Sequence, residues 1–128
     1  MSFVNDPIGD LLTRMRNAQA ARREGCSASW SRIKQELCDV LKREGLLQEV
    51  TVTGEDPKKN LEVTFVPGRK LQVKRISTPG RRVYSKSMSL RPVLRGYGLS
   101  ILTTSEGLLT DSEARKRRLG GEVLCTVS

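Results

Sequence analysis

Histidine is absent from this chain of 128 residues. Histidine is the general base of Ser-His and Cys-His nucleophile pairs, so neither arrangement can form. The sequence also lacks a Walker-type phosphate loop and a dinucleotide-binding GxGxxG segment. Glu122 and Cys125 are the one conceivable base and nucleophile, but on a strand they would point to opposite faces. We therefore expect no catalytic centre, with an enzyme of unfamiliar site as an open alternative.

Cysteine is scarce and its spacing is uninformative. The chain has three cysteines, Cys26, Cys38 and Cys125, with no CxxC pair. Without histidine there is no second soft ligand to complete a zinc site. We expect free thiols in a reducing compartment, no metal and no cofactor.

Long hydrophobic runs are missing as well. The longest apolar runs reach four residues or fewer, whereas a helix that spans a bilayer needs about 18–20. No signal peptide or amphipathic leader is visible at the N-terminus. These features predict a cytoplasmic protein without a membrane anchor.

Aromatic residues are few: one Trp, two Tyr and two Phe. Proteins that read single-stranded RNA stack unpaired bases on aromatic rings, and this chain cannot build a broad platform of that kind. If its partner is RNA, we expect recognition of a folded shape through backbone and minor-groove contacts.

Positive charge is abundant, and it is concentrated in one segment. The chain carries 23 Lys and Arg against 14 Asp and Glu, a net charge of +9. Residues 63–105 contain no acid and nine of the cations: Arg69, Lys70, Lys74, Arg75, Arg81, Arg82, Lys86, Arg91 and Arg95. A surface that is merely soluble would mix the signs. The asymmetry favours a binding face for a polyanion, with nucleic acid as the first candidate.

The first half of the chain predicts two helices and two strands. Asp6 and Pro7 form a helix start, and apolar residues then recur at helical spacing up to Ala18. Ser31 caps a second helix, which ends before Gly45. Strands are expected over residues 46–53 and 61–66, followed by a Pro-Gly break. We place a lobe boundary there, with lobes at residues 1–66 and 67–128.

The second half predicts strands at residues 71–76, near 83–84 and at 99–103. A helix over residues 111–118 begins with Thr110 and Glu113 spaced as a capping box. Gly120 and Gly121 are expected to end it, with glycine at the C′ position. A last strand places Val123, Cys125 and Val127 on one face. The fold class is α+β: two small α+β lobes packed together, with mixed or antiparallel sheets flanked by helices.

Several blocks of the sequence match one known family. Near the C-terminus these are TTSEG, LLTDSEARK and GGEVLC, and upstream they are DPIGDLLTRMRNA, LKREG and STPGRRVYSK. The blocks lie in family order and span nearly the whole chain. On these residues the protein resembles the small-subunit ribosomal protein S8 family, bacterial type.

The residues and the resemblance together give a candidate RNA-binding site. Small hydroxyls on a glycine turn can approach phosphate, sugar or base edges closely, and the resemblance implies that this turn is a principal contact with ribosomal RNA. Basic residues near the STPG turn can neutralise phosphates, with one tyrosine ring between them. The resemblance adds the Gly-Gly-Glu turn as a second-rank contact. The candidates are Thr103, Thr104, Ser105, Gly107, Ser77, Arg81, Arg82, Tyr84, Lys86, Gly121 and Glu122.

Two expectations about RNA-binding residues leave alternatives open, and two positions depart from the family pattern. Arg14 and Asn17, on the polar side of the first helix, are either a solvated face or a phosphate-facing edge. Tyr84 is either a base-stacking ring or a core aromatic with its hydroxyl at the surface. Glu106 and Thr78 depart from the usual family pattern, and both departures remove positive charge from the site.

The function that the resemblance implies is structural. The protein would bind a central-domain helix of small-subunit ribosomal RNA during assembly, with neighbouring ribosomal proteins as partners. Some members of the family also bind messenger RNA that mimics the ribosomal site. The alternative is a free-standing RNA-binding translational regulator.

Overall fold

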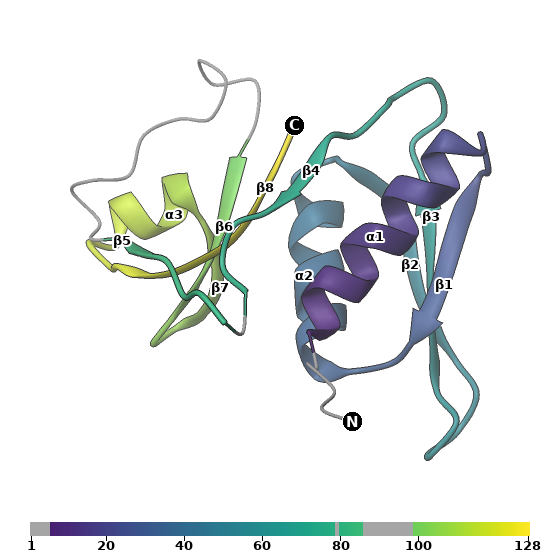
Figure 1. Cartoon of the computed structure of the whole chain (residues 1–128), viewed down its shortest axis with the longest axis horizontal. Helices are drawn as coiled ribbons and strands as arrows, with labels where there is room; N and C mark the ends of the chain where they lie inside the picture. Colours follow the sequence, from purple (N-terminus) through teal and green to yellow (C-terminus); the bar gives the residue numbers. More distant parts are fainter. Residues whose placement is uncertain (1–5, 79, 86–98) are drawn as a thin grey trace. The chain divides into compact units, whose positions relative to one another are not determined.

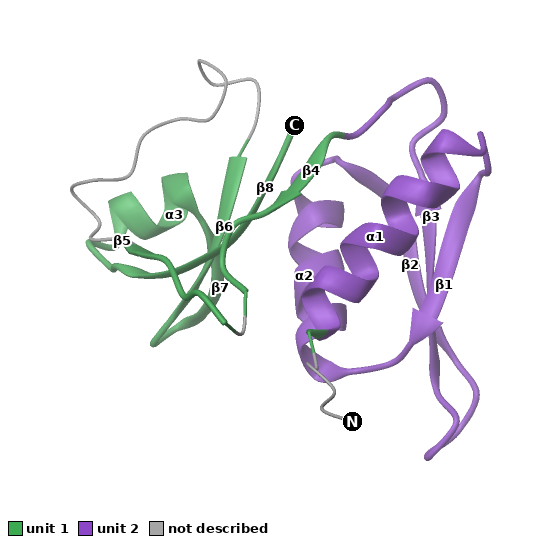
Figure 2. Cartoon of the chain, in the orientation of Figure 1, with its two compact units in different colours: residues 1–6, 72–128 green, residues 7–71 purple. Residues whose placement is uncertain are grey.

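The computed structural model describes residues 6–78, 80–85 and 99–128. The chain divides into two compact units (Figure 2). Unit 2 is Pro7–Leu71, and unit 1 comprises Asp6 together with Gln72–Ser128. Each unit combines helix with an antiparallel sheet (Figure 1). The predicted α+β class is therefore confirmed.

Unit 2 consists of two helices and a three-stranded sheet. Its elements are α1 (Pro7–Ala20), β1 (Gly25–Ser29), α2 (Arg32–Arg43), β2 (Leu47–Thr53) and β3 (Asn60–Phe65). The strand order is β1-β3-β2, with both pairs antiparallel. Along β3, Leu61, Val63 and Phe65 are buried and the residues between them are exposed. One face of the sheet is thus apolar, and α1 and α2 pack on it (Figure 1).

The apolar stripe of α1 and the cap of α2 agree with the sequence, whereas the predicted cap of α1 does not. The apolar stripe of α1 is buried, as predicted: Ile8, Leu11, Leu12, Met15 and Ala18. Ser31 caps α2, because its hydroxyl accepts a hydrogen bond from the Lys34 backbone N–H. Asp6 was predicted to cap α1. Its carboxylate accepts hydrogen bonds from Arg75 Nη2 at 3.0 Å and Nε at 3.3 Å rather than from the α1 backbone.

Unit 1 is built around its last strand. Its elements are β4 (Val73–Arg75), β5 (Tyr84–Ser85), β6 (Leu99–Thr104), β7 (Gly107–Thr110), α3 (Asp111–Lys116) and β8 (Gly121–Val127). The strand order is β4-β8-β6-β7, and β5 also pairs with β8. β4 lies beside the C-terminal half of β8 and β5 beside its first two residues. Leu102 of β6 and Ala114 of α3 are fully buried together, with Val123 packed against them.

The helix α3 starts as predicted and ends earlier. Thr110 and Glu113 form the capping box. The predicted end at Gly120 and Gly121 is wrong, because the Leu119 N–H already bonds to the Ala114 carbonyl at 2.9 Å. This bond closes a Schellman-type end in which Arg118 takes the left-handed conformation, with φ of 56°. An arginine there costs about 1–2 kcal/mol in backbone strain.

Candidate nucleic-acid interface

Thr104, Ser105, Glu106 and Gly107 form the tip of the hairpin of β6 and β7, and we call this tip the hydroxyl turn. Thr104 pairs with Gly107 across the hairpin, so Ser105 and Glu106 form the turn itself. Gly107 has φ of 99°, a conformation that side-chain-bearing residues rarely adopt. Its position is otherwise open, with no heavy atom within 4 Å of where a Cβ would lie. Glycine is required here by backbone conformation, and the turn presents its backbone to solvent.

The hydroxyls of this turn have different surroundings. Thr104 Oγ1 donates to the Gly107 carbonyl at 2.9 Å and accepts from the Glu106 N–H at 3.2 Å. It therefore holds the turn in shape. Ser105 is exposed, and its hydroxyl has no partner within the described part of the chain. Ser105 is the hydroxyl of this turn that is best placed to bind a ligand.

The strand β8 joins the hydroxyl turn to the basic segment, by which we mean Arg81, Arg82 and the strand β5 that follows them. Glu122 of β8 lies opposite Thr103 of β6 on one side and opposite Tyr84 of β5 on the other. Residues directly opposite each other share one face of a sheet. The three residues, which are distant in sequence, therefore form one cross-strand row.

Gly121 allows this row to form. A Cβ at Gly121 would lie 2.1 Å from the Thr103 carbonyl oxygen and 3.2 Å from Thr104 Cγ2. Only glycine lets β8 approach the end of β6 so closely. The role of Gly121 in the geometry is thus to bring β8 against the base of the hydroxyl turn.

The segment before β5 is held by a buried serine. Ser77 is fully buried, and its hydroxyl accepts from the Val83 N–H at 2.8 Å and donates to the Val83 carbonyl at 3.1 Å. The backbones of Thr78 and Arg81 pair with each other and close the turn between them. Ser77 therefore positions this segment, and because its side chain is fully buried it is not accessible to a ligand.

The side chains that this segment presents are cationic and aromatic. Tyr84 is 70% exposed, so it is not a core aromatic. Arg81 is exposed and has no ion-pair partner within the described residues. Arg82 Nη1 donates to Glu122 Oε2 at 3.0 Å, and this hydrogen bond raises the pKa of Arg82 above its usual range. Glu122 is 9% exposed, so its carboxylate serves mainly to hold Arg82.

Every acidic side chain described in unit 1 is engaged. The ion pairs are Asp6 with Arg75, Glu106 with Arg117, Asp111 with Arg115 and Glu122 with Arg82. Glu113 belongs to the capping box. The Glu106 carboxylate, which would repel a phosphate if it were free, lies 3.4 Å from Arg117 Nη1. Lys74, Arg81, Lys116 and Arg118 have no ion-pair partner among the described residues, so the unbalanced charge of this unit is positive.

The remaining predicted residues lie elsewhere. Arg14 and Asn17 are on α1 in unit 2, and both are exposed. Arg14 pairs with Asp10 at 3.1 Å, which uses part of its charge within the protein. Lys86 lies outside the described residues.

The described residues contain no group of three or more Cys, Asp and Glu side chains able to hold a metal ion. Burial raises the pKa of both the Cys38 and the Cys125 thiol to about 12, so neither is a ready nucleophile. No helix in the described ranges is long and apolar enough to cross a membrane. The chain is a small basic α+β protein, with a net charge of +9.

Comparison with known proteins identifies the family. The profile of the family described as ribosomal protein S8 matches residues 6–128. The small ribosomal subunit protein uS8 of Rhodopirellula baltica is 46% identical over 133 residues, covering 98% of this chain and 100% of the relative. Its counterpart in Rubrobacter xylanophilus is 44% identical over 129 residues, covering 97% and 98%. The chain belongs to the ribosomal protein S8 family.

Proposed function

We propose that the protein is a structural constituent of the small ribosomal subunit that binds a central-domain helix of ribosomal RNA during assembly. The observation that carries this proposal is the cross-strand row of Tyr84, Glu122 and Thr103. Through it, the hydroxyl turn and the basic segment belong to one continuous sheet. A surface of this kind can contact one RNA element with both pieces at once.

The contacts divide into two kinds. Arg81 and Arg82 lie near phosphates and release counterions, which makes binding strongly dependent on salt. Ser105 hydrogen-bonds to a sugar or phosphate oxygen, and the open backbone of Gly107 allows the RNA to approach closely, while Gly121 holds β8 beside the turn. Tyr84 offers one exposed ring, enough for one unstacked base. Recognition therefore rests on the shape of a folded RNA.

Several predicted residues take supporting roles in this proposal. Ser77 positions the basic segment, Thr104 fixes the turn, and Glu122 orients Arg82. Arg14 and Asn17, on α1, provide contacts at the edge of the complex. Lys86 continues the basic segment along the chain.

The most direct test is Ser105→Ala. The turn keeps its internal hydrogen bonds, which belong to Thr104, so thermal stability should not change. Affinity for small-subunit ribosomal RNA should fall by about 3- to 10-fold, the worth of one hydrogen bond. Ser27→Ala, at an exposed serine of β1 in unit 2, is the matched control and should bind as the wild type does. Equal affinity for the two variants would refute the assignment of the turn.

A second test separates phosphate contacts from the turn. Arg81→Ala should reduce the slope of log affinity against log salt concentration by about one unit. If the slope stays the same, Arg81 faces water in the complex.

The same surface would bind a messenger RNA with the shape of the ribosomal site, so regulation of translation is the alternative function. Sedimentation of a cell lysate distinguishes the two. A structural constituent should sediment almost wholly with small subunits and neighbouring ribosomal proteins. A free-standing regulator should remain largely in the soluble fraction.

A further inference from the structure

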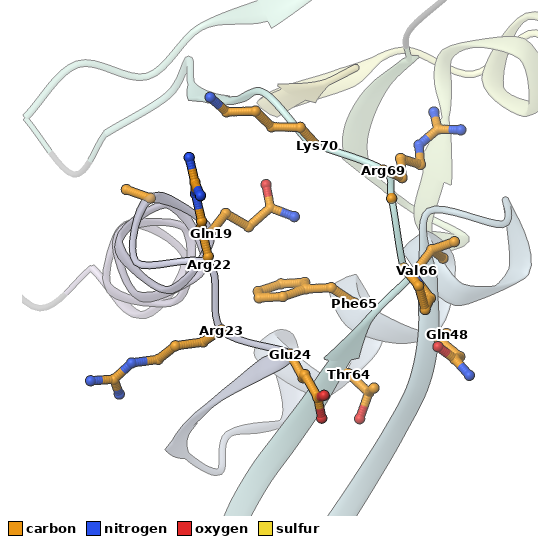
Figure 3. A pocket seen from close by; sticks show the side chains of 13 residues that line it. Gln19, Arg22, Arg23, Glu24, Gln48, Thr64, Phe65, Val66, Arg69 and Lys70 are labelled. Carbon is orange, nitrogen blue, oxygen red and sulfur yellow. The ribbon is translucent and has the colours of Figure 1, made fainter.

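Unit 2 contains a hollow that the ribosomal proposal above does not use. It has a volume of about 800 Å³ and lies between the end of α1 and the chain that follows β3. The Phe65 ring and the Gln19 amide point into it (Figure 3). Arg22 and Lys70 are among the basic residues that line it. A space of this size accommodates a nucleotide-sized ligand.

The cations around the hollow are not neutralised by the protein. Elsewhere in unit 2, Arg14, Arg32, Lys34, Lys42 and Lys59 each form an ion pair. By contrast, no ion pair within the described residues involves the four cations at the hollow, Arg22, Arg23, Arg69 and Lys70. Glu24 is the one acid among the lining residues, and its side chain points away from the Phe65 ring (Figure 3). The hollow is therefore a site of unbalanced positive charge.

Arg22 occupies a backbone position that suits glycine. The Arg23 N–H bonds to the Ala18 carbonyl at 2.9 Å and the Arg22 N–H to the Gln19 carbonyl at 3.0 Å, which forms a Schellman-type end to α1. Arg22 has φ of 58°. The helix α2 ends with the same two bonds, and there the left-handed residue is Gly45. An arginine held in strained backbone at the edge of a charged hollow indicates a role for its side chain.

A hydrogen-bond donor is also fixed at the hollow. Gln19 Oε1 accepts from the Leu71 N–H at 2.8 Å, which sets the orientation of the amide. Its NH₂ group is then free to donate to an anion. Phe65 is 6% exposed, so its ring adds little to the surface of the hollow. The core of a protein–protein interface is depleted of charged residues, whereas a phosphate needs cations and hydrogen-bond donors, and the hollow has both.

We propose that this hollow binds a backbone phosphate of a second RNA segment, with Arg22 and Lys70 as the charged contacts and Gln19 as a donor. The inference rests on the proposed function in taking RNA as the ligand. It differs in assigning a second RNA segment to a site in unit 2, through residues other than Arg14 and Asn17 and not shared with the surface of unit 1. The protein would then hold two RNA segments at once.

The test compares single-charge variants of the full chain binding to full-length small-subunit ribosomal RNA. Lys70→Ala should lower the salt slope of binding by about one unit. Lys58→Ala is the matched control, because Lys58 is an exposed lysine of the same unit without an ion pair in the described residues and lies outside the hollow. Its slope should equal that of the wild type. The inference is overturned if the two variants show the same slope.

Arg22→Gly separates binding from folding. Glycine suits the left-handed position, so the melting temperature should stay level or rise by about 2–4 °C. RNA affinity should nevertheless fall by about 3- to 10-fold. Unchanged affinity would show that Arg22 only ends the helix, and would overturn its assignment as a contact.

The identity of the occupant is tested in assembled subunits. A photo-crosslinking residue at position 70 should give adducts with ribosomal RNA, and adducts with protein alone would overturn the inference. The two proposals fail in different ways. If the wild type does not bind the RNA, the proposed function has failed. If it binds and Ser105→Ala weakens it while Lys70→Ala behaves as Lys58→Ala, only the hollow has been misassigned.

Discussion

Glu122 accepts a hydrogen bond from Arg82 at 3.0 Å, and the same glutamate lies opposite Thr103 in the sheet. One buried carboxylate therefore sits between the basic segment and the strand that leads to the hydroxyl turn. The pair contributes little to stability, because the Arg82 side chain is 48% exposed and solvent screens the interaction. Its value lies in fixing the direction of the guanidinium.

This relationship predicts the outcome of a double-mutant cycle for RNA binding. Glu122→Gln removes the charge that holds Arg82, and it should lower RNA affinity by about 3-fold through a less ordered guanidinium. In an Arg82→Ala background the same substitution should have no further effect. Affinities for ribosomal RNA at one salt concentration measure the cycle. A persistent effect without Arg82 would mean that Glu122 itself contacts RNA.

Gly121 gives a second prediction, on stability. Gly121→Ala places a methyl group against the Thr103 carbonyl, so β6 and β8 must separate, and the free energy of unfolding should fall by about 2–3 kcal/mol. Gly80→Ala is the control, because a Cβ there meets no atom within 4 Å and its φ is not left-handed. Denaturant unfolding should leave the Gly80 variant within about 0.5 kcal/mol of the wild type. Equal losses in both variants would contradict the packing argument.

The helices and the caps of α2 and α3 were predictable because their causes are local. The stripe of α1 and the Ser31 cap of α2 need only a few neighbouring residues, and both are confirmed. The strand β7 was missed, because its four residues begin with a glycine and show no polar alternation. Its pairing with β6 depends on the turn at Ser105 and Glu106. The end of α3 was misplaced because a left-handed arginine breaks the usual preference for glycine.

The candidate site was predictable in composition and not in arrangement. The hydroxyl turn and the acid-free segment are visible as residues, but the register of β8, which joins them, arises from long-range pairing. For the same reason the sequence could not show that Ser77 is buried behind Val83. The hollow of unit 2 was missed because Arg22 and Lys70 are separated by 48 residues (70 − 22), and only the fold brings them together.

Lys34 gives a prediction for acid conditions. Its side chain is 5% exposed, and Nζ donates to the Ser29 carbonyl at 3.1 Å and to Asp10 Oδ2 at 3.4 Å. Burial acts to raise the pKa of Asp10, but hydrogen bonds from Arg14 and Lys34 outweigh it and lower the pKa below its usual value. A carboxylate of this kind stabilises the fold above its unfolded pKa, and this contribution is lost as pH falls through its folded pKa.

Lys34→Met should therefore raise the pKa of Asp10, because only Arg14 still opposes the effect of burial. Acidification should then cost the variant less stability than it costs the wild type, because the folded pKa of Asp10 lies closer to its unfolded pKa. Titration of the Asp10 carboxyl by NMR, together with unfolding at several pH values, measures both effects. In an Asp10→Asn background the same lysine substitution should leave the acid dependence unchanged. A shift that survives in that background would place its origin elsewhere.

The three thiols should differ in reactivity in the folded protein. Burial raises the pKa of Cys38 and Cys125 to about 12, and it raises the pKa of the half-buried Cys26 as well. At pH 8 nearly all three are protonated, and the thiolate is the reactive form. Cys26 should react first with a thiol reagent, whereas Cys38 and Cys125, at 0% exposure, should react only as their units open. Cys26→Ser should remove the fast phase and leave the slow one. Denaturant should merge the phases, and one rate for all three thiols in the native protein would contradict this account of their burial.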